Sequence, residues 1–268
     1  VQRLSDGPII DTAMSPRLTA LAEEQGYSNI NGPSLIRVPD WVENPLGNYY
    51  LYFSHHKGDF IRLAYADTVE GPWSIYEPGA LALKDSGFPS ESIPRLSLGE
   101  GLAELWDAVS IYLFRDSILA VYQAVVTDQE IRKQRGIAVS QTLKAHIASP
   151  EVVIDEANQQ IVMFFHGQRD SLSQVSGVAL STNGLDFIAS EKELGAVYLR
   201  SFTYKDQYYF LAAPGILYRS DELLGDYEPR GKSLFGNDTR HSAVLLQDDQ
   251  LTVVWSRVGD APERLLVS

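Results

Sequence analysis

The sequence predicts an all-β protein, a five-bladed β-propeller of four-stranded antiparallel blades. Aromatic and β-branched residues gather in short apolar runs that are separated by Gly and Asp turns, which is typical of strands. A hairpin-like unit, made of an apolar run, a polar turn and a second apolar run, recurs five times, about 50 residues apart. The last copy stops after its third strand, as in a propeller whose ring is closed by the other end of the chain.

The repeat can be followed along the whole chain. The hairpin copies are residues 33–54, 108–123, 150–165, 198–213 and 242–256. A third run follows at residues 61–67, 135–140, 176–181, 215–221 and 263–268, and a fourth begins at 71–76, 185–190 and 225–229. Each unit buries its apolar faces only against neighbouring units, so five copies predict five blades around an axis.

The N-terminal region is predicted to complete this ring. Residues 3–11 would supply the outer strand that the fifth copy lacks, and residues 19–27 show the only helical periodicity. We therefore expect a single domain over residues 1–268, with the closing strand and a short helix within residues 1–28.

Composition limits the partners. With 22 Lys and Arg against 35 Asp and Glu, the net charge of −13 disfavours nucleic acid and anionic membranes. No apolar run approaches the roughly 20 residues of a membrane helix, and no charged-then-apolar leader precedes Val1, so we expect a soluble chain. Cys is absent, which excludes disulfides but leaves cytoplasm, periplasm and secretion open. We expect a bacterial source.

Propeller geometry predicts where a site would lie. The start of each innermost strand and the end of each second strand open on one face, and all five histidines fall there. They are His55 and His56 from the first copy, His146 and His166 from the third, and His241 from the fifth. Imidazole titrates near neutral pH, so this concentration indicates a functional site. Because neighbouring strand residues alternate sides, either His55 or His56 should point away.

Other residues on the same face are predicted to hold a substrate. They are Asn31, His56, Glu104, Trp106, Gln123, Arg200, Arg240 and Arg257. The arginines suit a bidentate grip on a carboxylate or sulfate, although Arg200 and Arg257 could equally form salt bridges between blades. Phe88 and Trp106 are the candidate aromatic platforms for a sugar ring.

Several stretches resemble the five-bladed propeller glycoside hydrolases of family 43, the arabinanase and β-xylosidase type. They are NGPSLIRV with NYYLYFS, ASPEVVID with IVMFFHG, and DTVEGPW. The resemblance implies a carbohydrate-active enzyme that cleaves glycosidic bonds between carboxylates. The positions of those carboxylates hold Gly32, Ser149 and Leu199 or Arg200 instead, so the fold is implied but the carboxylate mechanism is not. His241 matches the family histidine near an axial ion or water.

Three functional hypotheses remain for an oligo- or polysaccharide partner. In the first, Asp107 is the carboxylate acid or base, and His55 and His166 transfer protons. The reaction is then either hydrolysis, which could involve an acidic sugar, or β-elimination from a uronate. In the second, His55 or His56, His166 and above all His146 and His241 supply three imidazoles to zinc or another divalent metal ion on or near the axis. In the third, the propeller binds carbohydrate without catalysis.

Overall fold

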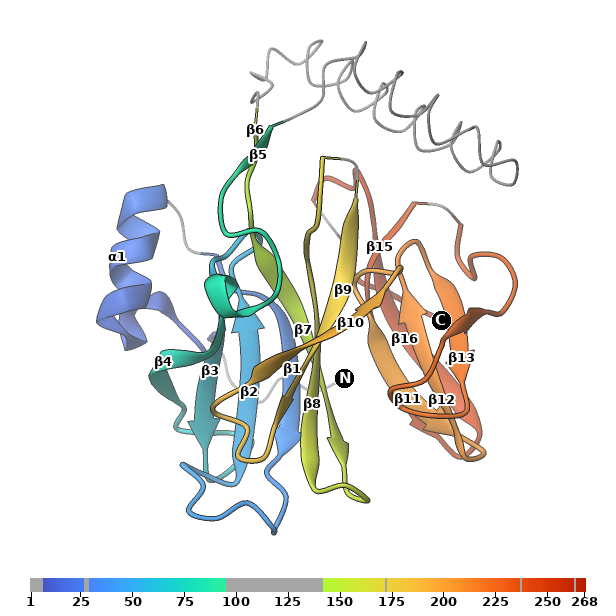
Figure 1. Ribbon diagram of the computed structural model, residues 1–268, viewed down its shortest axis with the longest axis horizontal. Helices are drawn as coiled ribbons and strands as arrows, with labels where there is room; N and C mark the ends of the chain where they lie inside the picture. Colours follow the sequence, from blue (N-terminus) through green and yellow to red (C-terminus); the bar gives the residue numbers. More distant parts are fainter. Residues whose placement is uncertain (1–6, 27–28, 95–141, 172, 237, 263) are drawn as a thin grey trace.

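The computed structural model describes residues 7–26, 29–94, 142–171, 173–236, 238–262 and 264–268 (Figure 1). Antiparallel sheets dominate it, which confirms the predicted all-β propeller. We number each sheet as a blade after the sequence copy that forms it.

Four blades account for most of the strands. Blade one holds β1 (Asn31–Arg37), β2 (Tyr49–Ser54), β3 (Phe60–Ala66) and β4 (Ser74–Ala82). Blade three holds β7 (Ile147–Asp155), β8 (Gln160–Gln168), β9 (Gln174–Ser181) and β10 (Ile188–Leu194). Blade four holds β11 (Arg200–Tyr204), β12 (Gln207–Ala212), β13 (Ile216–Ser220) and β14 (Glu228–Pro229). Blade five holds β15 (Thr239–Gln247), β16 (Gln250–Arg257) and β17 (Leu266–Val267). A separate two-stranded sheet is formed by β5 (Ile93–Pro94) and β6 (Thr142–Leu143).

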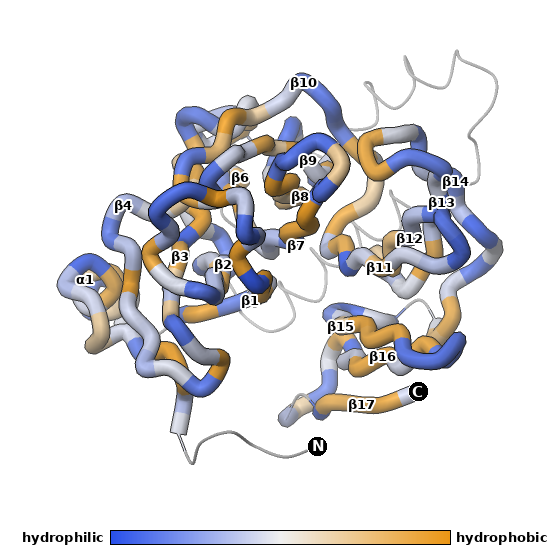
Figure 2. The backbone as a smooth tube through the Cα atoms, turned by 90° about the horizontal axis from the view of Figure 1, so that it is seen from below, coloured by the Kyte–Doolittle hydropathy of each residue, from blue (hydrophilic) through white to orange (hydrophobic). Residues whose placement is uncertain are grey.

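The first strand of each blade lies nearest the centre. Figure 2 shows β1, β7, β11 and β15 toward the middle, with later strands of each blade farther out. Strand β7 contacts both β1 and β11, and β11 contacts β15. The blades therefore follow one another in the order one, three, four, five.

Alternating side chains hold neighbouring blades together. In β2, Tyr50 and Tyr52 face blade three, whereas Leu51 and Phe53 face the N-terminal helix. In β8, the odd-numbered residues Ile161, Met163 and Phe165 face blade one, whereas Val162 and Phe164 face blade four. Burial on both faces explains why these strands read as continuous apolar runs. It also predicts that His166, which continues the even-numbered face of β8, points toward blade four.

The described residues form four blades rather than the predicted five. Blades one and three share one apolar core, and hydrogen bonds join them directly, from the Ser149 N–H to Ser54 Oγ at 3.0 Å and from the Val152 N–H to Ser34 Oγ at 2.9 Å. This close contact leaves no room for a blade between them. The second sequence copy, residues 108–140, lies outside the described residues.

The N-terminal region also differs from the expectation. Residues 7–11 form no strand, and residues 1–6 lie outside the described part, so the closing strand is not seen. A 3-10 turn, η1 (Thr12–Met14), leads into helix α1 (Pro16–Gln25), which starts earlier than predicted because Ser15 caps it and Pro16 occupies its first turn. Gly26 ends the helix in the left-handed conformation.

The helix lies against the outer face of blade one. Leu18 packs with Leu51 and Phe53, and Ser15 Oγ donates a hydrogen bond to Glu77 at 2.9 Å. A second 3-10 turn, η2 (Leu83–Asp85), follows β4. No helix in the described part of the chain is long and apolar enough to cross a bilayer. The single-domain organisation stays a prediction.

Candidate functional site

The candidate site lies where three innermost strands begin. The pairing register shifts near the start of β1, β7 and β15, between Asn31 and Ser34, between Ala148 and Glu151, and between Thr239 and Ser242. Such β-bulges turn side chains away from the regular alternation and recur next to active sites. The three bulges therefore aim residues of different blades toward one region.

Aromatic rings from blades three, four and five form a continuous chain in this region. The His146 and His166 ring centroids are 5.8 Å apart, and the His166 and Tyr198 centroids are 4.5 Å apart. Tyr198 also contacts His241, with 5.2 Å between centroids. His166 faces blade four, as the alternation along β8 requires. The structure thus brings together three of the five histidines that the sequence singled out.

His56 joins this cluster through a loop that is fastened to blade three. The Ile147 N–H donates to the Gly58 carbonyl at 2.9 Å, which holds the loop after β2 against the residue that follows His146. Asn29 fixes the other side, because its Oδ1 accepts from the His56 N–H at 3.0 Å and from the Asn31 side-chain amide. Asn31, a predicted substrate contact, therefore supports the loop.

His55 has a different environment. It is buried, and its Nδ1 accepts a hydrogen bond from the Lys57 N–H at 3.0 Å. Burial and the charge of nearby Arg62 lower its pKa to about 4. Its ring stabilises the turn at residues 55–58, and its predicted role in proton transfer stays a prediction.

The cluster has a buried layer and a partly exposed layer. His146 and His166 are each only 2% exposed, whereas His56, Tyr198, Arg240 and His241 are partly exposed. A ligand that approaches from solvent therefore meets the second group first.

Burial keeps the imidazoles neutral. Desolvation, reinforced by the charges of His146 and His56, lowers the pKa of His166 to about 3, and desolvation also lowers the pKa of His146 and His56. The Lys144 carbonyl lies 2.8 Å from His146 Nδ1, so that nitrogen donates the proton and Nε2 remains an acceptor. Within the described residues, His166 Nδ1 is buried without a hydrogen-bond partner. Such buried orphan atoms are uncommon and indicate a ligand or water contact.

Arg200 connects the blades beside the cluster, where its charge helps to lower the pKa of His166, and its predicted role in substrate binding stays a prediction. Its Nη1 donates to Glu151 Oε2 at 3.0 Å and its Nε donates to the Ser242 carbonyl at 3.1 Å, so it joins blades three, four and five. Glu151 in turn accepts from the N–H and Oγ of Ser201, at 2.7 Å each. The blade-to-blade salt bridge is the alternative that the sequence left open for this residue.

The other two predicted arginines differ from each other. Arg257 lies 3.6 Å from Asp238 and packs over Trp255, and both charged side chains are about half exposed. This pair lies within blade five. Arg240 precedes His241 in the bulge of β15, and its charge acts on the pKa values of His56 and Tyr198. The charges of Arg200 and Arg240 thus both act on members of the aromatic cluster.

Sequence reasoning missed Tyr198. It is the first residue of the fourth repeat copy, and its φ of 57° is rare for a residue other than glycine. Ser149 has a φ of 50° at the corresponding place in blade three. Strained residues of this kind cluster at functional sites. An aromatic residue where an innermost strand begins was the available signal.

The remaining predictions fall into two groups. Asp107, Glu104, Trp106 and Gln123 lie outside the described residues, so their roles stay predictions. In the described ranges, no three His, Asp or Glu side chains converge in a way that could hold a metal ion. The ring contacts run from His146 through His166 and Tyr198 to His241, and the metal site at His146 and His241 stays a prediction.

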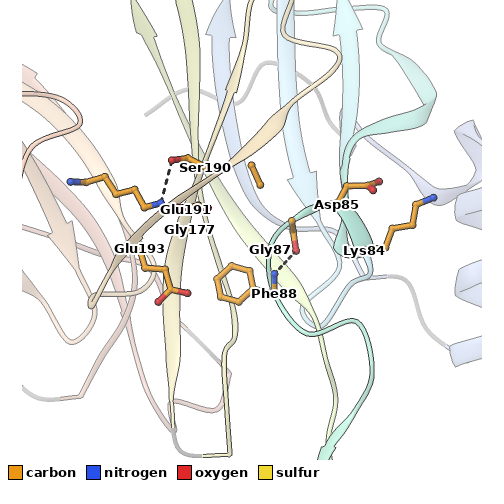
Figure 3. Close-up of a pocket in the computed structure, with 11 residues that line it drawn as sticks. Lys84, Asp85, Gly87, Phe88, Gly177, Ser190, Glu191 and Glu193 are labelled. Carbon is orange, nitrogen blue, oxygen red and sulfur yellow. Dashed lines mark hydrogen bonds between the residues drawn. The ribbon is translucent and has the colours of Figure 1, made fainter.

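A separate groove of about 370 Å³ lies between η2 and the outer strands of blade three. Figure 3 shows Phe88 between Gly87 and Gly177, with Lys84 and Asp85 on one side and Glu193 on the other. Phe88 is only 7% exposed and its ring packs against Phe165 at 5.7 Å. Phe88, a predicted sugar platform, is thus packed into the core, and no other predicted catalytic or binding residue lines the groove.

Comparisons with known proteins agree with the fold. No family model matches the chain. An uncharacterised protein of Acanthamoeba polyphaga mimivirus is 27% identical over 262 residues, which cover 89% of this chain and 61% of that protein. The chain thus spans about three fifths of this curated relative, whose viral origin does not support the expected bacterial source.

Solved structures of glycoside hydrolases share the architecture. The exo-β-1,3-galactanase of Phanerochaete chrysosporium, solved with galactose, has a TM-score of 0.54 at 10% identity over 91% of this chain and 48% of its own. The exo-β-1,3-galactanase of Clostridium thermocellum has a TM-score of 0.50 at 11% identity over 85% of this chain and 43% of its own. At such identities the likeness shows the fold alone, a β-propeller that this chain shares with these glycoside hydrolases.

Proposed function

We propose that this protein acts on an oligo- or polysaccharide at the cluster of His56, Tyr198 and His241 and cleaves a glycosidic bond there. The observation that carries the proposal is the convergence of imidazole and phenol rings from successive blades at the bulged ends of the innermost strands. Aromatic faces pack against sugar rings, and neutral imidazoles exchange hydrogen bonds with sugar hydroxyls.

The chemistry proposed for this cluster relies on neutral imidazoles. A neutral imidazole accepts a proton, as a general base does. Asp107 stays our sequence-based candidate for the carboxylate partner. His166 is assigned to positioning, because its ring lies beneath Tyr198 and its lowered pKa keeps it uncharged.

Binding without catalysis is the second candidate, and one contact favours it. Gly32 occupies the first position at which the family places a carboxylate, and a Cβ atom there would lie 2.9 Å from Ser149 Cα. An acidic side chain at residue 32 would therefore collide with blade three. Arg200 lies at or next to another position where the family places a carboxylate, and it forms a salt bridge with Glu151.

A substrate screen separates the two candidates. Purified protein is incubated with a panel of oligosaccharides while reducing ends and the absorbance of unsaturated products are followed, and binding is measured by calorimetry. Catalysis in which the Tyr198 hydroxyl takes part in the proton transfer predicts that Tyr198→Phe, which keeps the ring and removes only the hydroxyl, lowers kcat/KM by about 10²-fold or more. The matched control is Tyr209→Phe, because Tyr209 stacks on Phe202 away from the cluster. Sugar binding without product would leave only the second candidate, and no binding at all would refute both.

A further inference from the structure

One imidazole nitrogen in the cluster has no partner. His166 is only 2% exposed, and its Nδ1 makes no hydrogen bond within the described residues. The residue opposite His166 on β9 is Ser176, but its hydroxyl donates to the Ala196 carbonyl at 2.7 Å. A buried polar atom without a partner is unfavourable and uncommon, so this nitrogen indicates a place where a polar group binds.

His146 adds a second polar ring to the same place. Its ring centroid lies 5.8 Å from that of His166, and the two rings meet edge to face. Since the Lys144 carbonyl accepts the proton of His146 Nδ1 at 2.8 Å, the Nε2 atom of His146 is an acceptor. That atom has no hydrogen-bond partner among the residues that the structure describes. The two histidines thus form a buried polar pair.

The ring of Tyr198 covers this pair on the solvent side. Its centroid lies 4.5 Å from that of His166, and Tyr198 is partly exposed whereas His166 is buried. In the part of the chain with described coordinates, contacts with His166 and His241 hold the ring, and the Tyr198 hydroxyl makes no hydrogen bond. Rotation of the side chain therefore breaks no hydrogen bond, and exposed side chains change rotamer readily.

The backbone of Tyr198 is consistent with a moving part. Its φ of 57° lies in the left-handed region, which is costly for an aromatic residue. Strain of this kind is found at ligand clamps and switch regions.

We propose that Tyr198 is a movable cover over a binding site for one sugar hydroxyl, formed by His166 Nδ1 and the His146 ring. The inference rests on the proposed function and adds a subsite to it. A hydroxyl both donates and accepts, so it satisfies His166 Nδ1 in either tautomer. Because burial lowers the pKa of both histidines, neither ring carries a charge that would favour an anion over a hydroxyl.

Chemical modification tests the cover. Diethyl pyrocarbonate reacts with neutral imidazole nitrogens, and mass spectrometry of peptides gives the rate at each histidine. We expect Tyr198→Ala to speed the modification of His166 by about tenfold or more, because a larger fraction of molecules has an open site. His55 is the internal control: it is equally enclosed but lies in the turn after β2, so its rate should stay within about twofold. No rise at His166, or an equal rise at both histidines, would overturn the cover.

Sugars that lack one hydroxyl test the ligand. The probes are the methyl glycosides of galactose, xylose and arabinose, each with its monodeoxy analogues, and calorimetry measures their affinities. We expect one analogue to bind the wild type about tenfold more weakly than its parent, and to bind His166→Phe as well as its parent does. Phe164→Leu is the matched control, because Phe164 is buried on the same face of β8 and the variant keeps His166. It should retain the tenfold difference.

The outcomes separate this inference from the proposed function. If sugars bind but each missing hydroxyl costs the same affinity in His166→Phe as in the wild type, the hydroxyl site is overturned and the proposed function stands. Loss of the difference in Phe164→Leu as well would assign it to packing and would also overturn the site. If no sugar binds, the proposed function fails and the subsite fails with it.

Discussion

Gly32 and Ser149 show how closely the first and third blades meet. Gly32 has a φ of 56°, and a Cβ atom there would lie 2.9 Å from Ser149 Cα and 3.1 Å from Ser149 Oγ. Real Cβ atoms do not approach backbone atoms this closely. Both the conformation and the contact therefore require glycine at this position.

Gly32→Ala should destabilise the protein by about 2 kcal/mol or more, from the left-handed conformation and the collision together. Gly26→Ala is the matched control: Gly26 has a φ of 74°, but a Cβ there meets nothing within 4 Å. Gly26→Ala should lower the free energy of unfolding by only about 1 kcal/mol. Urea unfolding of both variants measures the difference, and equal losses would show that the contact between blades does not matter.

His166 makes stability depend on pH. Its pKa is about 3 in the folded protein, against an ordinary value of 6.5. Above pH 6.5 the ring is neutral in both the folded and the unfolded chain, so it causes no loss of stability. As pH falls below 6.5, only the unfolded chain gains the proton, and stability declines until about pH 3.

The pH effect can be assigned to this residue. At pH 5 the loss from His166 alone is about 2 kcal/mol relative to pH 7. His166→Gln, which does not titrate, should lower stability at pH 7 but flatten the decline from pH 7 to pH 5 by about that amount. Guanidinium unfolding at both pH values gives the slope. An unchanged slope in the variant would mean that His166 has the same pKa in the folded and the unfolded protein.

Among the elements, β7, β11 and β15 depend on one ion pair. Arg200 at the start of β11 joins Glu151 of β7 and the Ser242 carbonyl of β15. Removing one partner of a buried pair leaves the other charge uncompensated. We expect Arg200→Met to cost about 3 kcal/mol, and Arg200→Met combined with Glu151→Gln to recover part of it.

A surface pair in the same fold provides the comparison. Arg257→Met breaks the contact with Asp238, in which the side chains are 48% and 52% exposed, and should cost less than about 1 kcal/mol. Thermal and urea unfolding of the three variants tests both statements. A loss at Arg257 as large as that at Arg200 would contradict the view that Arg200 joins the blades.

The element scale also shows what the sequence could predict. Short apolar runs and their repeat identified strands in blades one, three, four and five, because a buried strand must place apolar residues on both faces. The short helix and the third strand of blade five were also predicted, within a few residues. The contact between blades one and three was not, because a repeat defines each unit but not which units touch.

The site was predictable to a similar extent. The expected strand ends predicted, from the sequence alone, that His146, His166 and His241 lie on one face. The roles of Arg200 and His55 depend on partners that are distant in sequence or on the turn geometry, so no local pattern reveals them. Tyr198 was missed because aromatic residues at strand starts usually belong to the core.

At the scale of the whole molecule, the blades differ in how much core they share. Blade three is covered on both faces, by blade one through Ile161, Met163 and Phe165 and by blade four through Phe164. Blade five shares only a small core, in which Leu211 of β12 meets Val253 and Trp255. Several of its apolar side chains are exposed, including Leu245 and Val267.

This difference predicts the order in which the molecule opens. Local opening costs less free energy where fewer apolar contacts are lost, so the amides of β16 should exchange hydrogen before those of β8. Hydrogen exchange followed by mass spectrometry at constant pH measures both strands in one experiment. Trp255→Ala should speed exchange in blade five and leave β8 unchanged, whereas Met163→Ala should speed exchange in blades one and three together. If all four blades exchange at one rate in the wild type and in both variants, the propeller is a single cooperative unit, and the unequal cores do not divide it.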